Sequence, residues 1–419
     1  MQAKPIGFAS GQYPSGHFTY PDICTSHIHH AMNAFPLDRL ASRLHNIPPF
    51  HVMELLTRAQ ALQAQGRDII HMEVGEPDFP TPAPIIDAAQ RFLAQGQVRY
   101  TPALGLPALR EAISGFYATR FGAEVPAERI VITAGASGAL LLAVAALTNP
   151  GDEWLLTDPG YPCNRQFIQA FNGVVQALPV DADSNFQPRL AQVAEAWSNR
   201  TRGLLIASPS NPTGTLIDDL LLNQLADFAA ERKGNLIVDE IYQGLVYGQE
   251  ASTVLSRRND VFVVNSFSKY FGMTGWRLGW LVVPEGYTRH IEMLAQHLFI
   301  AASSPAQHAA LAAFTAENLT ILEARRSIFD TRRKALLQGL RSIGLNIDTE
   351  PTGAFYVYAR ISGQCSSMEL AHRLLEEAGV AVTPGLDFGA HRAQQHLRVA
   401  YTADVARIDE AIHRMRSVL

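Results

Sequence analysis

The stretch that decides the fold is VFVVNSFSKYFGMTGWRLGWLVV, residues 261–283. Its two ends, residues 261–266 and 278–283, are nearly continuous in apolar residues, as expected of strands that are covered on both faces. Between them stand Lys269 and Arg277, among small hydroxyl, aromatic and glycine residues. Open α/β sheets bind ligands beyond the ends of their strands, so both cations are candidates for a binding site.

Further apolar runs along the chain extend this pattern. Helical stretches separate most of them, and one such stretch opens with Pro107, which suits a first helical turn. The alternation predicts an α/β domain with a mainly parallel sheet. The other predicted strands of this domain are residues 130–133, 153–158, 203–208 and 235–240.

After about residue 290 the pattern changes to long helices and more widely spaced strands. Strands are predicted at residues 354–359 and 397–402, with a helix at 368–377 between them and a terminal helix after them. This order predicts a smaller α+β domain. The first forty residues are rich in Gly, Pro, Ser and His without periodicity, which favours an arm or a disordered extension over residues 1–40.

Composition limits the function. The chain has 419 residues, enough for two domains, and a net charge of −5 with scattered cations, so we predict no binding to nucleic acid. The longest aliphatic run, residues 138–147, is shorter than the roughly 20 residues of a membrane span and predicts a buried helix. The N-terminus lacks a secretory signal, and Cys24, Cys163 and Cys365 lie far apart, which favours a reducing cytoplasm. Residues 27–30, HIHH, lack a Cys or carboxylate partner, so we predict no metal site.

Four polar features follow predicted strands. TAGASGAL, residues 133–140, is either an anion site at a helix N-terminus or an ordinary tight turn. Asp239 either caps a helix or pairs with a protonated ligand nitrogen, and Asn211 lies at the sheet rim or simply in a turn. Lys269 is either an exposed loop lysine or a buried amine able to form a Schiff base with an aldehyde.

Together these features supply what pyridoxal 5′-phosphate needs from a protein: a phosphate cradle, a carboxylate for the ring nitrogen and a reactive lysine. From about Arg43 to the C-terminus the chain resembles the fold-type I aminotransferases of classes I and II, the aspartate aminotransferase superfamily. The matching segments, in chain order, are GEPDFPTP (75–82), YTPALGLPALREAI (100–113), TAGASGAL (133–140), DPGYP (158–162), SNPTG (210–214), VDEIY (238–242), SFSKYFGMTGWRLG (266–279) and LRVAYT (397–402).

The resemblance implies roles for individual residues. Lys269 would hold the cofactor as an aldimine and shuttle the substrate proton, and Asp239 would keep the ring nitrogen protonated. Tyr242 and Asn211 would bond the ring's phenolic oxygen, and Tyr161 would lie against the ring face. The other cofactor contacts would come from Gly135, Ala136, Ser137, Ser266, Ser268, Arg277 and, from a second subunit, Tyr100. The substrate would be held by Gly75, Asn211 and Arg398.

The resemblance also implies the architecture and the reaction. We expect a large cofactor-binding domain at residues 76–289, with a mainly parallel sheet of the seven-stranded type, and a small domain formed by residues 41–75 and 290–419. A homodimer would move the amino group of an L-amino acid to a 2-oxo acid by ping-pong chemistry. The alternatives are a C–S β-lyase on the same fold and a non-catalytic regulator that binds the cofactor.

The donor is expected to be a neutral or aromatic amino acid, with 2-oxoglutarate or pyruvate as the acceptor. Some relatives that prefer aspartate carry a lysine in the turn after the strand 130–133. Here that turn, AGASG at residues 134–138, has only small residues, which argues against a dicarboxylate donor.

Overall fold

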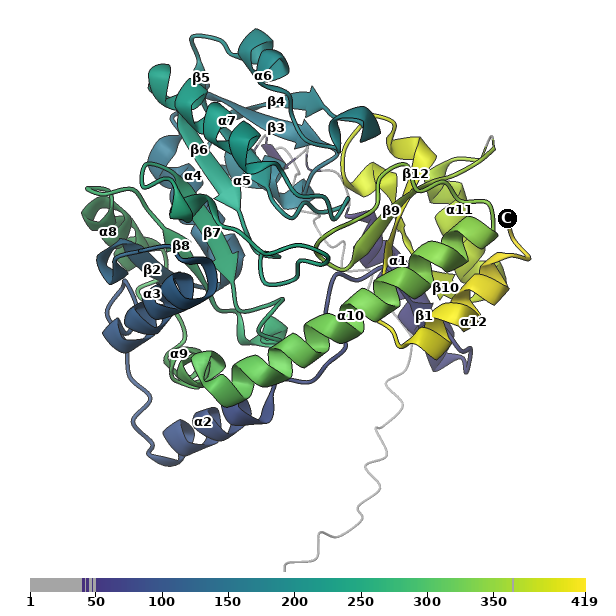
Figure 1. Ribbon diagram of the computed structural model, residues 1–419, viewed down its shortest axis with the longest axis horizontal. Helices are drawn as coiled ribbons and strands as arrows, with labels where there is room; N and C mark the ends of the chain where they lie inside the picture. Colours follow the sequence, from purple (N-terminus) through teal and green to yellow (C-terminus); the bar gives the residue numbers. More distant parts are fainter. Residues whose placement is uncertain (1–39, 42, 45–46, 48–49, 364) are drawn as a thin grey trace, which may run out of the picture. The chain divides into compact units, whose positions relative to one another are not determined.

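The computed structural model describes residues 40–41, 43–44, 47, 50–363 and 365–419. Apart from Leu40, the arm expected at residues 1–40 lies outside these ranges, and so do the HIHH segment at 27–30 and Cys24. The chain from Ile47 to Leu419 forms one compact unit (Figure 1). The boundary drawn between a large and a small domain remains a prediction.

A seven-stranded sheet with strand order β2-β8-β7-β6-β5-β3-β4 lies at the centre of this unit. Only β8 runs antiparallel to its neighbours, so the predicted α/β class with a mainly parallel sheet is confirmed. The sequence interpretation missed β4, an edge strand whose residues are mostly half-buried or exposed and therefore lack a continuous apolar run. The strands are β2 (Ile130–Thr133), β3 (Glu153–Asp158), β4 (Val174–Pro179), β5 (Thr201–Ala207), β6 (Asn235–Asp239), β7 (Phe262–Ser266) and β8 (Gly279–Val282).

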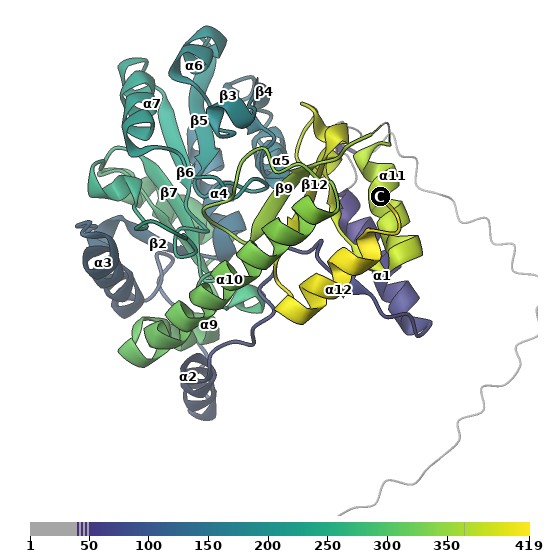
Figure 2. The same cartoon turned by 45° about the vertical axis from the view of Figure 1, so that its right-hand side comes forward.

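Helices cover both faces of this sheet because successive side chains of a strand point to opposite faces. On β7, Val264 packs in the cluster formed with α4 (Gly135–Leu147), α5 (Pro162–Ala170) and α8 (Thr288–Leu298). Its neighbour Val263 packs in the cluster formed with α3 (Pro107–Phe121), α6 (Leu190–Ala196) and α7 (Asp219–Glu231). Figure 2 shows these three helices around the strands of the large sheet. The run at residues 138–147 is thus part of the buried helix α4, as predicted.

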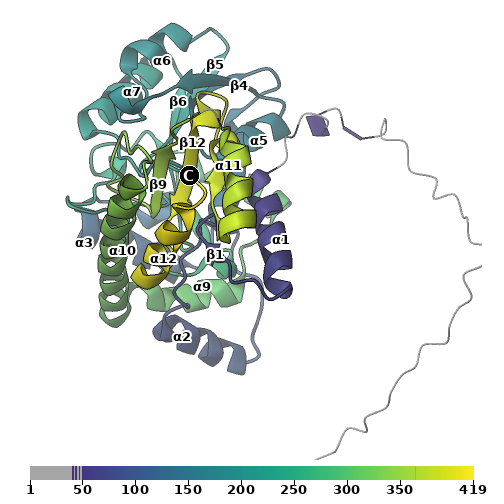
Figure 3. The ribbon, with the colours of Figure 1, turned by 90° about the vertical axis from the view of Figure 1, so that its right-hand side faces the viewer.

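Two smaller sheets join distant parts of the chain. β9 (Tyr356–Arg360), β12 (His396–Ala400) and β11 (Thr383–Pro384) form an antiparallel sheet, packed by α10 (Ala316–Ser342) and α11 (Ser367–Arg373) (Figure 3). β1 (Ile70–His71) pairs in parallel with β10 (Val380–Ala381), which ties the segment leading to Gly75 to the C-terminal part of the chain.

The remaining helices complete the unit. No helix in the described ranges is both long enough and apolar enough to cross a membrane. The remaining helices of the unit are α1 (His51–Ala64), α2 (Ala83–Ala94), α9 (Ser304–Ala310) and α12 (Val405–Met415).

Candidate active site

A cavity of about 220 Å³ lies at the ends of the strands of the large sheet. Most of the residues predicted from the sequence line it, although they come from segments far apart in the chain. Those residues are Gly75, Ala136, Ser137, Tyr161, Asn211, Asp239, Tyr242, Ser266, Ser268, Lys269, Arg277 and Arg398.

Two predicted residues lie outside this lining. Gly135 stands directly behind it with φ +70°, and a Cβ atom there would lie 2.9 Å from Nη2 of Arg277, so only glycine allows the arginine this close. Tyr100 is 83% exposed in this chain. Its predicted contact with a second subunit stays a prediction.

Lys269 lies just beyond the end of β7, where its side chain reaches the cavity. The ammonium donates to the backbone carbonyl oxygen of Gly75 at 2.5 Å. Burial in the cavity lowers the pKa of Lys269 to about 8, because desolvation disfavours the charged form and the cations Arg398 and Arg277 add to it. An appreciable fraction of the amine is therefore neutral, and so nucleophilic, at physiological pH.

We expect this lowered pKa to control the reactivity of Lys269 in cofactor-free protein. Labelling with an acylating reagent, followed residue by residue with peptide mass spectrometry, should give a rate profile for Lys269 with its midpoint near pH 8. In protein unfolded by urea the midpoint should move to about 10.5, the ordinary value for lysine. Identical midpoints in folded and unfolded protein would contradict the burial argument.

Asp239 ends β6 and is buried at the floor of the cavity. Among the described residues, its side chain receives a hydrogen bond from the N–H of Ile241 to Oδ1 at 3.0 Å. Burial raises the pKa of Asp239 to about 6, against the opposing effects of that bond and of the Lys269 charge. The ionised form of such a buried carboxylate is stabilised by a cationic partner, which a protonated ring nitrogen would provide.

Arg398 extends from β12 into the other side of the cavity. Its Nη1 donates to Oδ1 of Asn211 at 2.9 Å, and its Nη2 donates to the carbonyl oxygen of Glu73 at 2.6 Å and to Oγ1 of Thr383 at 3.2 Å. The guanidinium is thus held in a fixed orientation. Its buried Nε has no hydrogen-bond partner in the described part of the chain, and the described groups that accept from its Nη atoms are all neutral. Such a cation suits a carboxylate ligand.

The region of the cavity next to the first turn of α4 suits an anion. Ala136 and Ser137 belong to the first turn of α4, where free backbone N–H groups and the helix dipole favour negative charge. The Ser266 hydroxyl accepts a hydrogen bond from the N–H of Ser268 at 3.0 Å and donates one to the Ser268 hydroxyl at 3.0 Å, which orients both side chains just beyond β7. Arg277 adds a full positive charge from a backbone with φ +53°, an uncommon conformation for a residue with a side chain.

One wall of the cavity was not predicted from the sequence. It is apolar and includes Phe50, Val52 and Met53 at the start of α1. The carboxylate of Asp387 accepts hydrogen bonds from the N–H groups of His51 (2.9 Å) and Val52 (2.8 Å), and so caps α1 from more than 300 residues away. No local motif marks this contact.

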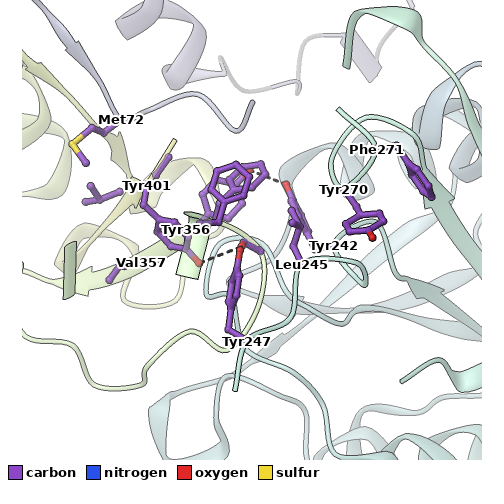
Figure 4. Packing of buried hydrophobic residues seen from close by; sticks show 14 of the residues in the cluster. Met72, Tyr242, Leu245, Tyr247, Tyr270, Phe271, Tyr356, Val357 and Tyr401 are labelled. Carbon is purple, nitrogen blue, oxygen red and sulfur yellow. Dashed lines mark hydrogen bonds between the residues drawn. The ribbon is translucent and has the colours of Figure 1, made fainter. Parts of the chain in front are cut away.

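Tyr356 is a second residue that the sequence interpretation missed. It lies on β9, lines the cavity, and its hydroxyl is 2.8 Å from the hydroxyl of Tyr242 (Figure 4). The available signal was weak, since the strand 354–359 is apolar or aromatic throughout and does not show which aromatic ring faces the cavity.

Proteins similar to this chain in sequence and in fold include several aminotransferases. The family model described as aminotransferase class I and II matches residues 67–415. The chain is 38% identical over 385 residues to valine–pyruvate aminotransferase of Mycobacterium tuberculosis, covering 91% of this chain and 99% of that one. It is 33% identical over 383 residues to aspartate aminotransferase of Thermotoga maritima, with the same shares covered.

Solved structures agree with the sequence comparison. The crystal structure of an aminotransferase from Mycobacterium tuberculosis superposes with a TM-score of 0.87 at 38% identity, covering 91% of this chain and 98% of that chain. The resemblance that rested on eight short segments is therefore confirmed over nearly the whole described chain. This chain belongs to the class I and II aminotransferase family.

Proposed function

We propose that the protein is a pyridoxal 5′-phosphate-dependent aminotransferase that moves the amino group of a neutral or aromatic L-amino acid to a 2-oxo acid. The observation that carries the proposal is the meeting of Lys269, Asp239, Arg277 and Arg398 in one cavity. A β-lyase on the same fold is not favoured, because the matched relatives are aminotransferases.

The groups that line the cavity fit this cofactor. Asp239 is a buried carboxylate that forms no salt bridge among the described residues, which suits the ring nitrogen, and the first turn of α4 with Ser266, Ser268 and Arg277 suits the phosphate. The absence of a Cβ at Gly135 lets Arg277 approach the helix end, which concentrates positive charge there. When bound, the cofactor supplies an aldehyde and an electron-withdrawing ring that can stabilise a carbanion.

Lys269 is proposed as nucleophile and general base. Its partly neutral amine can attack an aldehyde and can then take the proton from the substrate Cα and return it. Asp239 holds a proton on the ring nitrogen through an ion pair in a buried setting, where charge interactions are strong. Tyr242 and Asn211 would donate hydrogen bonds to the ring's phenolic oxygen, and Tyr161 would pack against the ring.

Arg398 binds the substrate α-carboxylate in this proposal. Asn211 accepts one N–H of Arg398 and keeps its own amide N–H groups available, so it links the carboxylate site to the ring-oxygen site. Gly75 contributes backbone beside the substrate, where a Cβ would lie 2.0 Å from the Tyr356 hydroxyl.

The apolar wall supports a neutral or aromatic donor. Phe50, Val52 and Met53, together with Leu140 and Ile241, offer no partner for a second carboxylate, whose desolvation would be costly. A screen of amino donors against pyruvate and 2-oxoglutarate tests the function. We expect kcat/KM for valine, leucine or phenylalanine to exceed that for aspartate by about 10- to 100-fold. Equal or better use of aspartate would contradict the assigned donor class.

Replacing Arg398 with methionine should impair substrate binding selectively. The loss of a buried charged contact, about 2–5 kcal/mol, lowers kcat/KM for every α-amino acid by about 30-fold or more. Arg398→Lys keeps the charge but loses the planar fork, so it should recover only part of this loss. Covalent attachment of the cofactor to Lys269, measured by mass spectrometry after borohydride reduction, should persist in both variants. If amine donors without a carboxylate lost as much activity, Arg398 would have another role.

We also propose a homodimer in a reducing cytoplasm, with residues 76–289 as the large domain and residues 41–75 with 290–419 as the small domain. The exposed Tyr100 supports a shared site, because the family resemblance implies that this residue contacts the phosphate in a neighbouring subunit. Light scattering of the purified protein measures the oligomeric state directly.

Cys163 and Cys365, the cysteines in the described part of the chain, are free thiols, which agrees with a reducing compartment.

A further inference from the structure

We propose that Tyr356 is a positioning residue for the cofactor's phenolic oxygen, acting through the hydroxyl of Tyr242. The inference rests on the proposed function above, in which Tyr242 donates to that oxygen. The two hydroxyls lie 2.8 Å apart, both side chains are buried, and both line the cavity (Figure 4). Tyr242 follows the central strand β6, whereas Tyr356 comes from the smaller sheet.

Counting protons fixes the direction of this hydrogen bond once the cofactor is bound. A phenol hydroxyl carries one proton and can donate only once, although it can also accept. If the Tyr242 proton bonds the ring oxygen, then the proton between the two tyrosines must belong to Tyr356. The arrangement is a chain of two donors, from Tyr356 to Tyr242 and from Tyr242 to the ring oxygen. The reverse direction would leave the ring oxygen without the Tyr242 donor.

The surroundings hold the Tyr356 hydroxyl in place. Its ring meets the Tyr242 ring edge to face, with centroids 5.7 Å apart and an interplanar angle of 81°. The Arg398 guanidinium lies 4.2 Å from the Tyr356 ring centroid. On the remaining side the Cα of Gly75 packs so close that a Cβ would lie 2.0 Å from the hydroxyl oxygen. The hydroxyl therefore has little freedom to choose another partner.

Such a chain strengthens the second hydrogen bond. A hydroxyl that accepts a hydrogen bond becomes a better donor, and the effect is larger in a buried site than in water. Tyr356 therefore helps Tyr242 to stabilise negative charge on the ring oxygen, which favours the form of the lysine-linked cofactor that has lost the shared proton. The charged groups that line the same cavity are Arg398, Lys269, Asp239 and Arg277, and Tyr356→Phe keeps all four.

The test is a spectrophotometric pH titration of the substrate-free holoenzyme. Tyr356→Phe keeps the ring, its packing and its contact with Arg398, and removes only the hydroxyl. We expect the midpoint of the absorbance change of the lysine-linked cofactor to rise by about half a pH unit. Tyr358→Phe is the matched control, because Tyr358 is buried on the same strand but does not line the cavity and its hydroxyl has no partner in the described residues. Its midpoint should equal that of the wild type.

A double variant separates action through Tyr242 from a direct effect. On the Tyr242→Phe background, Tyr356→Phe should leave the midpoint unchanged, because the intermediate hydroxyl is gone. An unchanged midpoint in the single variant, or the same rise on both backgrounds, would overturn the proposal. A wild-type protein that shows no lysine-linked absorbance would instead overturn the proposed function, and this inference with it, before any variant is compared.

Discussion

Replacing Lys269 with alanine is expected to lower transamination by at least about 10⁴-fold, the upper range for the loss of a general base, because the variant also loses its nucleophile. The reason is the position of the amine. It lies just beyond the end of β7, inside a cavity that lowers its pKa to about 8, and Lys269 is the one lysine among the described residues that line this cavity. Lys269→Arg should be equally inactive, since a guanidinium stays charged and cannot act as a nucleophile.

Two measurements check this result. Steady-state rates with the best donor give the loss of turnover, and borohydride reduction followed by mass spectrometry shows whether the cofactor is attached to residue 269. Lys334→Ala is the control, because Lys334 is exposed on α10, where it forms a salt bridge with Asp330, and it does not belong to the cavity lining. It should keep wild-type turnover and attachment. Covalent attachment in Lys269→Ala would mean that another lysine is the reactive one.

Replacing Asp239 with asparagine or alanine should lower kcat by about 10²–10³-fold, the range for losing one preorganised charge interaction in a buried site. The carboxylate is buried and receives a hydrogen bond from Ile241, so an asparagine can keep the shape while losing the charge. Without that charge, the proton on the ring nitrogen is no longer stabilised. The ring would then stabilise less well the negative charge that forms when the proton is removed from the substrate Cα.

The informative comparison is between the rate of turnover and the covalent attachment of the cofactor to Lys269. Asp239→Asn should still carry the cofactor on Lys269 after borohydride reduction, with single-turnover rates reduced as much as kcat. Asp239→Glu retains the carboxylate and should lose less activity than Asp239→Asn. Equal losses in Asp239→Glu and Asp239→Asn would favour a shape requirement at this position over a charge requirement.

Much of the polar site could be predicted from the sequence because its residues follow strands directly. Asp239 and Lys269 come at or just after the ends of β6 and β7, so the direction of a parallel sheet brings them to one edge. Arg398 was harder to place from local pattern, because it lies within β12 and its orientation depends on Asn211 and on the Glu73 carbonyl. Only the resemblance to a family assigned its role.

The apolar half of the site could not be predicted from local pattern. Phe50, Val52 and Met53 reach the cavity because Asp387, distant in sequence, caps the helix that carries them. The partnership of Tyr356 with Tyr242 likewise spans 114 positions between two sheets. Hydrophobic periodicity reports which face of an element is buried but does not identify the residue that it meets.

The contact between Arg398 and the Glu73 carbonyl has a consequence for biosynthesis. These residues are 325 positions apart, and β1 pairs with β10 to hold the Glu73 segment in place. A nascent chain from which Arg398 has not yet emerged can contain all seven strands of the large sheet, but it lacks the arginine that we propose binds the substrate carboxylate. The carboxylate site that we propose is therefore complete only in a chain that has folded through Arg398.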